Sequence, residues 1–215
     1  MILNRLRAKT DRLIGRKTIV QFGPPRSGST LVYNILRDLF PDRSIEKAHR
    51  YRRDDLGIPV VATYRHPLDC IASSIQRYGR FPTNDVIEQQ ISEFEENGIW
   101  DILRIKDNSN VLLLRYEEFV YDFQVIFNGI EGFFDVKILP ETRNVLTERY
   151  QIEAVEEIVA RMGSFAEYDT RTLWHGKHIS KYKGAPFYYK TFFQDDQIAY
   201  LESVYNKFLR EFNYL

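Results

Sequence analysis

Residues 23–30 read Gly-Pro-Pro-Arg-Ser-Gly-Ser-Thr and follow the apolar stretch Thr18–Phe22. The spacing is that of the phosphate-binding loop Gly-x-x-x-x-Gly-Lys-Ser/Thr, except that Ser29 stands in the place of the lysine. Such a loop follows a buried strand and opens a helix, so its backbone N–H groups and the positive end of the helix dipole converge on an anion. Apolar residues recur at helical spacing over 31–39. We therefore expect a strand, an anion-binding loop and a helix in this order.

The missing lysine limits which anion the loop can be expected to bind. In ATP-using enzymes this lysine reaches the β- and γ-phosphates, so a serine at the same position argues against a triphosphate. Arg26 instead places a planar, permanently charged guanidinium inside the loop. We expect Arg26 and the backbone N–H groups of Ser27, Gly28, Ser29 and Thr30 to hold an anion other than a triphosphate.

Composition limits the possible partners. The 215 residues include 30 Lys plus Arg and 30 Asp plus Glu, so there is no basic excess that would favour a nucleic-acid partner. Cys70 is the only cysteine, and its apolar neighbours favour a buried helix position rather than a redox role. No apolar stretch has the length of a signal peptide or a membrane span. These features predict a cytoplasmic protein with no membrane partner.

Strand and helix patterns alternate along the chain. We predict strands over 18–22, 44–48, 59–64 and 111–114, and helices over 1–15, 29–40, 67–78, 85–105, 152–162 and 195–213. Short, unbroken apolar runs suit parallel strands that are covered on both faces. The sequence therefore predicts a single α/β domain over 1–215, with three α/β/α layers around a central parallel sheet, like that of P-loop NTPases.

One long segment, 163–193, has no helical or strand period. It contains Trp174, four tyrosines, His175, His178, Lys181 and Lys183. Long irregular segments inside compact domains are more often functional than idle. We expect this segment to cover part of the site.

Polar residues follow three further predicted strands. Lys47 and His49 come at the end of the second strand, Arg65 and then Ser73 follow the third, and Tyr116 follows the fourth. Ligands in open parallel sheets bind outside the carboxyl ends of the strands. We therefore expect these side chains to face the loop.

Taken in order, these motifs resemble the sulfotransferases that use 3′-phosphoadenosine 5′-phosphosulfate (PAPS). The matching residues are Pro25-Arg26-Ser27-Gly28-Ser29-Thr30-Leu31, Lys47-x-His49, Arg65-x-Pro67-x-Asp69-x-x-x-Ser73 and Arg115-Tyr116-Glu117. The resemblance spans most of the chain. It implies transfer of a sulfuryl group from PAPS to a hydroxyl or amine of a small-molecule or glycan acceptor, without a metal ion.

The resemblance also implies how PAPS would bind. The loop would hold the 5′-phosphosulfate, and Arg65 and Ser73 would hold the 3′-phosphate. Lys183-Gly184 is similar to the family's final phosphate-binding segment, although the match is short. Tyr116 would stack on the adenine, for which an exposed ring face is enough; packing in the core is nearly as good an explanation of this residue.

Three residues would perform the chemistry. Arg26 would neutralise charge on the leaving phosphate, and Lys47 would stabilise the oxygens of the sulfuryl group. His49 would take the proton of the acceptor, because its ordinary pKa of about 6.5 suits a base near neutrality. Glu46 is an alternative base, since some family members that act on amino sugars use a carboxylate.

Other interpretations remain open at this point. The loop frame and the α/β pattern are shared with nucleotide-type kinases, and a nucleotide-binding module without catalysis would show them too. His178 is either a contact to the 3′-phosphate or acceptor, or an ordinary loop histidine. Asp69 suits the first turn of a helix for structural reasons. The basic run 49–53 indicates an anionic or sugar-like acceptor, or a solvated turn.

Overall fold

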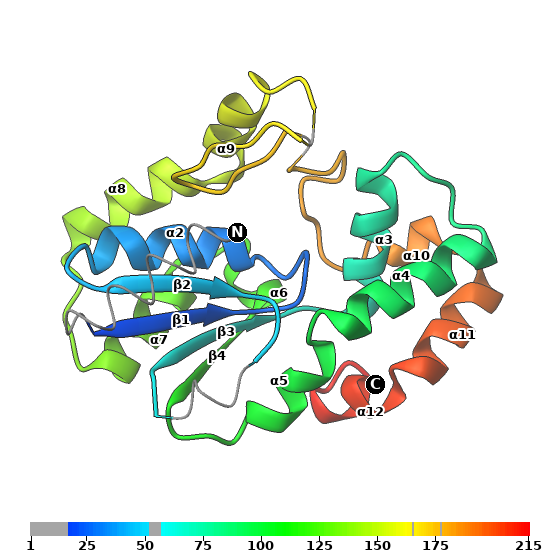
Figure 1. Cartoon of the computed structure of the whole chain (residues 1–215), viewed down its shortest axis with the longest axis horizontal. Coiled ribbons are helices and arrows are strands. Elements are labelled where there is room, and N and C mark those ends of the chain that lie inside the picture. The colour runs from blue at the N-terminus through cyan, green and yellow to red at the C-terminus, as the bar shows by residue number, and fades with distance from the viewer. Residues whose placement is uncertain (1–16, 52–56, 165, 177) are drawn as a thin grey trace.

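A computed structural model of the protein describes residues 17–51, 57–164, 166–176 and 178–215. Within these ranges a four-stranded parallel sheet has the order β2-β1-β3-β4 (Figure 1). The strands are β1 Thr18–Phe22, β2 Ser44–Ala48, β3 Val60–Tyr64 and β4 Val111–Arg115. All four strands were predicted, and the central parallel sheet is confirmed. The predicted helix over 1–15 lies outside the described residues.

One helix of the described residues follows β1 in the chain, and the others follow β3 or β4. Their bounds are α2 Ser29–Leu39, α3 Pro67–Arg77, α4 Asn84–Glu96, α5 Ile99–Ile105, α6 Tyr116–Phe119, α7 Gln124–Phe134, α8 Pro140–Tyr150, α9 Ile152–Val159, α10 Tyr189–Phe192, α11 Asp195–Val204 and α12 Asn206–Glu211. Among the described residues, no helix is both long and apolar enough to cross a membrane.

Side chains alternate between the two faces of the sheet, which gives the fold its three layers. Ile19 and Val61 pack with α2, α6, α7, α8 and α9 on one face. Val20 and Val60 pack with α3, α4, α5, α11 and α12 on the other. Successive residues of a strand point to opposite faces, so each apolar strand contributes to both cores.

The strand register brings the polar residues to one edge. Phe22 at the end of β1 pairs with Ala48 on one side and with Ala62 on the other, and Tyr64 pairs with Arg115. Because all four strands are parallel and nearly level, the residues that follow them emerge at the same edge. This is the edge at which ligands bind in such sheets.

Two expected helices are each divided in two. The region 85–105 forms α4 and α5, separated at Gly98, whose φ is 83°. A side chain at Gly98 would meet the carbonyl oxygen of His49 at 2.2 Å, so close backbone contact requires the glycine there. The region 195–213 forms α11 and α12, which meet at Tyr205. Helices α6, α7 and α8 were not predicted.

The described residues of segment 163–193 form turns, an antiparallel bridge between Tyr168 and His175, and the short helix α10. After α9 the chain crosses the carboxyl ends of the strands and reaches α10 beside α3 (Figure 1). Contacts with the loop, α3 and α6 hold this path, as described below.

Candidate functional site

The loop after β1 is held open by two residues with positive φ. Arg26 has φ 68° and Gly28 has φ 79°, and α2 begins at Ser29. The Ser27 hydroxyl donates to the carbonyl oxygen of Pro24 at 2.7 Å and lies 2.9 Å from the hydroxyl of Thr63. This side chain therefore closes the loop, while the first N–H groups of α2 have no partner within the helix. The loop geometry suits an anion.

Arg26 connects the loop to two distant segments. Its Nε donates to Ser73 Oγ in α3, and its NH2 donates to the carbonyl oxygen of His178, both at 2.9 Å. Ser73 is 2% exposed. Two of the residues expected to bind opposite ends of a nucleotide are thus already in contact with each other.

Lys47 and His49 leave β2 on the side of the loop. Lys47 Nζ donates to Thr30 Oγ1 at 2.6 Å, and His49 Nδ1 lies 2.7 Å from the carbonyl oxygen of Gly23. A carbonyl oxygen only accepts, so Nδ1 of His49 carries the hydrogen and Nε2 of the neutral ring is an acceptor. Glu46 points to the opposite face of the strand and does not line the cavity that contains Lys47 and His49.

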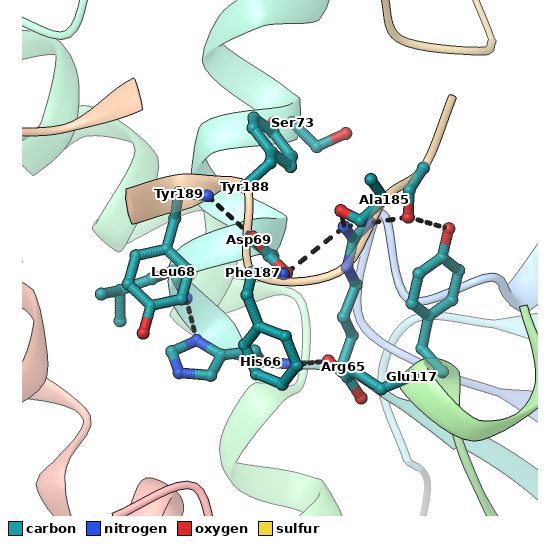
Figure 2. Close-up of polar contacts among 12 residues, drawn as sticks. Arg65, His66, Leu68, Asp69, Ser73, Glu117, Ala185, Phe187, Tyr188 and Tyr189 are labelled. Carbon is teal, nitrogen blue, oxygen red and sulfur yellow. Dashed lines mark hydrogen bonds and ion pairs between the residues drawn. The ribbon is translucent and has the colours of Figure 1, made fainter. Parts of the chain in front are cut away.

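Arg65 is buried in a network that ties α3 to the 184–189 segment (Figure 2). Its NH2 lies 3.4 Å from Asp69 Oδ2 and donates to the carbonyl oxygen of Ala185 at 3.1 Å. The same carboxylate accepts from the backbone N–H groups of Phe187 at 2.6 Å and Tyr189 at 3.1 Å. Burial raises the pKa of Asp69, and the guanidinium and the two N–H groups oppose this shift. Asp69 therefore holds a chain segment in addition to lying in the first turn of α3.

Tyr116 lies between the loop and the late segment. Its ring is 4.2 Å from the Arg65 guanidinium carbon, and its hydroxyl donates to the carbonyl oxygen of Gly184 at 2.8 Å. A Cβ on Gly28 would lie 2.9 Å from the Tyr116 ring. Lys183 Nζ pairs with Glu156 at 2.9 Å on the surface. Tyr116 is thus largely packed in the protein, and Lys183 makes its ion pair outside the network.

These groups surround one cavity of about 230 Å³. Every residue predicted to bind PAPS or to act in the reaction lines it, except Ser27 and the alternative base Glu46. Among the described residues, its lining includes five lysines or arginines, namely Arg26, Lys47, Arg65, Arg77 and Lys183, and no aspartate or glutamate. An anion is the complementary ligand for such a lining.

The positive charges disturb each other's ionisation. Burial, followed by Arg26 and Arg77, lowers the pKa of Lys47 to about 7. Burial, followed by Lys47, lowers the pKa of His49 to about 4, although the Gly23 contact opposes this. Burial and Arg65 also lower the pKa of Arg26. A bound anion would relieve all three shifts.

The other end of the cavity is apolar. It is lined by Val120, Phe123, Tyr150, Ile152, Val155 and Trp174, which come from α6, α8, α9 and the segments around them. A basic end and an apolar end together suit a nucleotide, with its phosphates and its base. Of these residues only Trp174, in the segment expected to cover the site, was singled out from the sequence, because the others look like ordinary helix core.

Trp174 Nε1 and His178 Nδ1 are buried polar atoms in the lining with no hydrogen-bond partner among the described residues. Trp174 is 3% exposed, and the two rings meet edge to face at 4.6 Å. Buried polar atoms without partners are costly, so their presence beside a cavity indicates groups that a ligand would satisfy.

Arg50 and Tyr51, the described residues of the basic run after His49, do not line this cavity. Arg50 is 66% exposed and lies 4.0 Å from the equally exposed Glu96. Arg52 and Arg53 lie outside the described residues. Arg77, which the sequence did not single out, is instead the additional cation in the lining.

Neither a family model nor a curated protein matches the sequence, whereas solved structures match the fold. One is mouse sulfotransferase SULT7A1 complexed with PAP, with a TM-score of 0.65 and 12% identity over 90% of this chain and 85% of that chain.

Retinol dehydratase gives a similar result in two complexes. The complex with androsterone and the inactive cofactor PAP has a TM-score of 0.66 and 14% identity, over 94% of this chain and 85% of that chain. The complex with retinol and PAP has a TM-score of 0.64 and 15% identity, over 94% of this chain and 86% of that chain. The chain therefore has the fold of the PAPS-dependent sulfotransferases, with a central parallel sheet flanked by helices.

Proposed function

We propose that this protein is an enzyme that transfers a sulfuryl group from PAPS to a hydroxyl or amine of an acceptor. The observation that carries the proposal is the cavity at the carboxyl edge of the sheet, whose lining, as far as the structure describes it, has five cationic side chains, no carboxylate and an apolar end. The sulfotransferase fold supports it, since the structures with that fold described above contain PAP.

The residues present suit PAPS at both ends. The loop and the start of α2 would hold the 5′-phosphosulfate through Arg26 and the N–H groups of residues 27–30. Arg65, Ser73 and Lys183-Gly184 would hold the 3′-phosphate. For this, the Lys183 ammonium would leave Glu156, with which it forms an exposed pair that contributes little to stability. Tyr116, Trp174 and the apolar lining would contact the adenine.

The adenine end of the cavity has two polar side-chain atoms that need hydrogen-bond partners, which a bound nucleotide could supply. The N–H of Trp174 and the Nδ1 atom of His178 are buried without partners. A purine and its ribose carry both donors and acceptors, so a bound nucleotide would supply the missing hydrogen bonds. Segment 163–193 would thus cover the nucleotide with these two side chains.

Side chains of the protein would accept the acceptor's proton and stabilise the negative charge of the transferred sulfuryl group and of the leaving phosphate. PAPS supplies the sulfuryl group and leaves as PAP. The acceptor oxygen or nitrogen would gain the new bond to sulfur while its proton passes to Nε2 of His49, and the bond from sulfur to the phosphate oxygen would break. Lys47 would stabilise the sulfuryl oxygens, and Arg26 would stabilise the charge left on the phosphate. His49 is favoured over Glu46 because it lines the cavity.

Ligand-dependent melting tests the proposal directly. PAP at 100 times its dissociation constant should stabilise the folded protein by about 2.7 kcal/mol, without added metal. ATP with Mg²⁺ should produce a much smaller shift, whereas a kinase would show the opposite order. If millimolar PAP left the melting temperature of the folded protein unchanged, the proposal would be wrong. Turnover of PAPS with an acceptor distinguishes the enzyme from a silent binding module.

A further inference from the structure

A second cavity, of about 190 Å³, lies between α3 and α4 beside the first. Pro25, His49 and Arg77 line both cavities. The proposed base therefore borders two spaces, one suited to the nucleotide and one that the nucleotide does not need. An acceptor has to reach the base from such a second space.

The lining of this second cavity is mainly polar. Ser74 and Arg77 come from α3, and Gln90 and Glu93 come from α4. Gln90 is only 3% exposed, and its Nε2 donates to Glu93 Oε2 at 2.8 Å. Gln89 donates to the other carboxylate oxygen of Glu93 at 2.9 Å. The carboxylate is thus held in place by two amides of its own helix.

The apolar part of the lining is smaller than the polar part. Ile71 and Phe94 are almost completely buried, and so is Cys70, as its sequence neighbours predicted. Asn97, after the end of α4, adds another amide, which donates to the carbonyl oxygen of Glu93 at 2.5 Å. The cavity therefore offers a carboxylate, two amides, a hydroxyl and a guanidinium to whatever enters it.

The chemistry of the lining selects the class of acceptor. An apolar acceptor would remove these polar groups from water without replacing their hydrogen bonds, at about 1–3 kcal/mol for each group. A molecule with several hydroxyls would donate to Glu93 and accept from Gln90 and Arg77. This cavity is also the smaller of the two, at about 190 Å³ against about 230 Å³ for the one assigned to the nucleotide.

We propose that the cavity between α3 and α4 binds a sugar and presents one of its hydroxyls to His49. This inference rests on the proposed sulfotransferase function. In the reaction the hydroxyl proton would pass to His49, the sugar oxygen would bond to sulfur, and PAP would leave. The lining differs in character from what an apolar acceptor such as the androsterone or retinol bound by retinol dehydratase requires.

The experiment has three steps, all with the full chain. The first step measures the melting temperature with and without PAP. The second step uses ligand-observed NMR to test whether the PAP-bound protein binds methyl β-D-glucoside, methyl β-D-galactoside or N-acetylglucosamine. Transfer from PAPS to these sugars and to 2-naphthol is measured last. We expect PAP to bind, at least one sugar to bind, and that sugar to be sulfated with a higher kcat/KM than 2-naphthol.

Two variants locate the site. Glu93→Gln should raise KM for the sugar by about tenfold, the equivalent of one charge-assisted hydrogen bond, and should leave the affinity for PAP unchanged. Gln90→Leu should have a similar effect. Glu88→Gln is the matched control, because Glu88 lies on the same helix outside the cavity; it should change nothing. The KM for 2-naphthol should not rise in any of the three variants.

The possible failures are distinguishable. If PAP does not bind, the sulfotransferase proposal and the sugar site both fall. If PAP binds but no sugar binds or is sulfated, or 2-naphthol is clearly preferred, the sugar site is wrong and the sulfotransferase proposal stands. If a sugar is sulfated but neither Glu93→Gln nor Gln90→Leu alters its KM, the acceptor does not occupy this cavity.

Discussion

The imidazole Nδ1 of His49 lies 2.7 Å from the carbonyl oxygen of Gly23. The contact places the ring hydrogen on Nδ1 and leaves the lone pair on Nε2, as a base requires. A side chain at Gly23 would lie 2.3 Å from the Thr63 hydroxyl and 2.8 Å from that of Ser27. The close packing at the end of β1 thus sets the tautomer of the proposed base.

Removing the imidazole should affect turnover much more than binding. His49→Ala should lower kcat by about 10²-fold or more, with the affinity for PAP changed less than twofold. Initial rates and calorimetry measure the two quantities. Arg50→Ala, at the exposed neighbouring residue, is the control. Normal turnover of His49→Ala would remove this residue from the mechanism.

The pH dependence of kcat/KM should reflect the lowered pKa of His49. Because burial and Lys47 lower this pKa to about 4, the ring stays neutral, and able to accept a proton, at any pH well above 4. We expect no loss of kcat/KM on the acid side between pH 7 and pH 5. An acid limb centred near 6.5, the value of an unperturbed histidine, would contradict this.

Lys47 should destabilise the ligand-free protein near neutral pH. Its pKa falls from 10.5 to about 7 through burial, Arg26 and Arg77. Between pH 7 and pH 10.5 the unfolded chain therefore binds more protons at this site, so this residue makes stability rise with pH. At pH 6.5, Lys47→Met should melt about 2–4 °C or more above the wild type.

The same substitution should weaken binding of PAP, whose negative charge Lys47 would neutralise. The wild type's affinity for PAP should fall as the pH rises above 7, by up to about tenfold per pH unit, because binding would then require uptake of a proton. Lys47→Met should lose this part of the pH dependence, whereas the exposed Lys207→Met should keep it. Calorimetry across pH 6–8.5 measures the affinity for PAP of the wild type and of both variants.

Substitution of Gly28 by alanine tests how tightly the loop is packed. Gly28→Ala adds a Cβ at φ 79° that would lie 2.7 Å from Phe119 and 2.9 Å from Tyr116. Gly79→Ala adds one at φ 65° with nothing within 4 Å. Gly79→Ala should cost about 1 kcal/mol in backbone strain, and Gly28→Ala about 1–3 kcal/mol more through overpacking. Equal losses in urea unfolding would show that the loop tolerates the clash.

Substitution of Asp69 tests whether its carboxylate holds segment 184–189 against α3. Asp69→Ala would leave Arg65 buried without its carboxylate and remove the acceptor of two backbone N–H groups, so it should cost about 3–5 kcal/mol of stability. Hydrogen exchange at Phe187 and Tyr189 should accelerate more than exchange in β1. Glu156→Gln breaks the exposed pair with Lys183 and should leave the unfolding midpoint unchanged. Unaltered exchange at residues 187 and 189 in Asp69→Ala would show that other contacts hold the segment.

Much of the fold and part of the site could be predicted from local patterns. The loop sequence 23–30 and the apolar runs around it specify a strand, a tight turn and a helix, because backbone conformation there depends on neighbouring residues. Parallel strands then bring the residues after them to one edge, which is why Lys47, His49, Arg65 and Ser73 could be grouped from the sequence. Gly98, at which α4 and α5 separate, is a local signal too.

The rest depends on contacts between residues far apart in the chain. Arg26 meets the carbonyl of His178 across 152 positions, and Asp69 meets the N–H of Phe187 across 118. No pattern of neighbours encodes such pairs, since they arise when packing brings two elements together. The sequence by itself determined the loop, the sheet and the residues at its edge. Only the tertiary structure decided the tautomer of His49, the apolar end of the first cavity and the polar cavity between α3 and α4, because each depends on which distant side chains share a space.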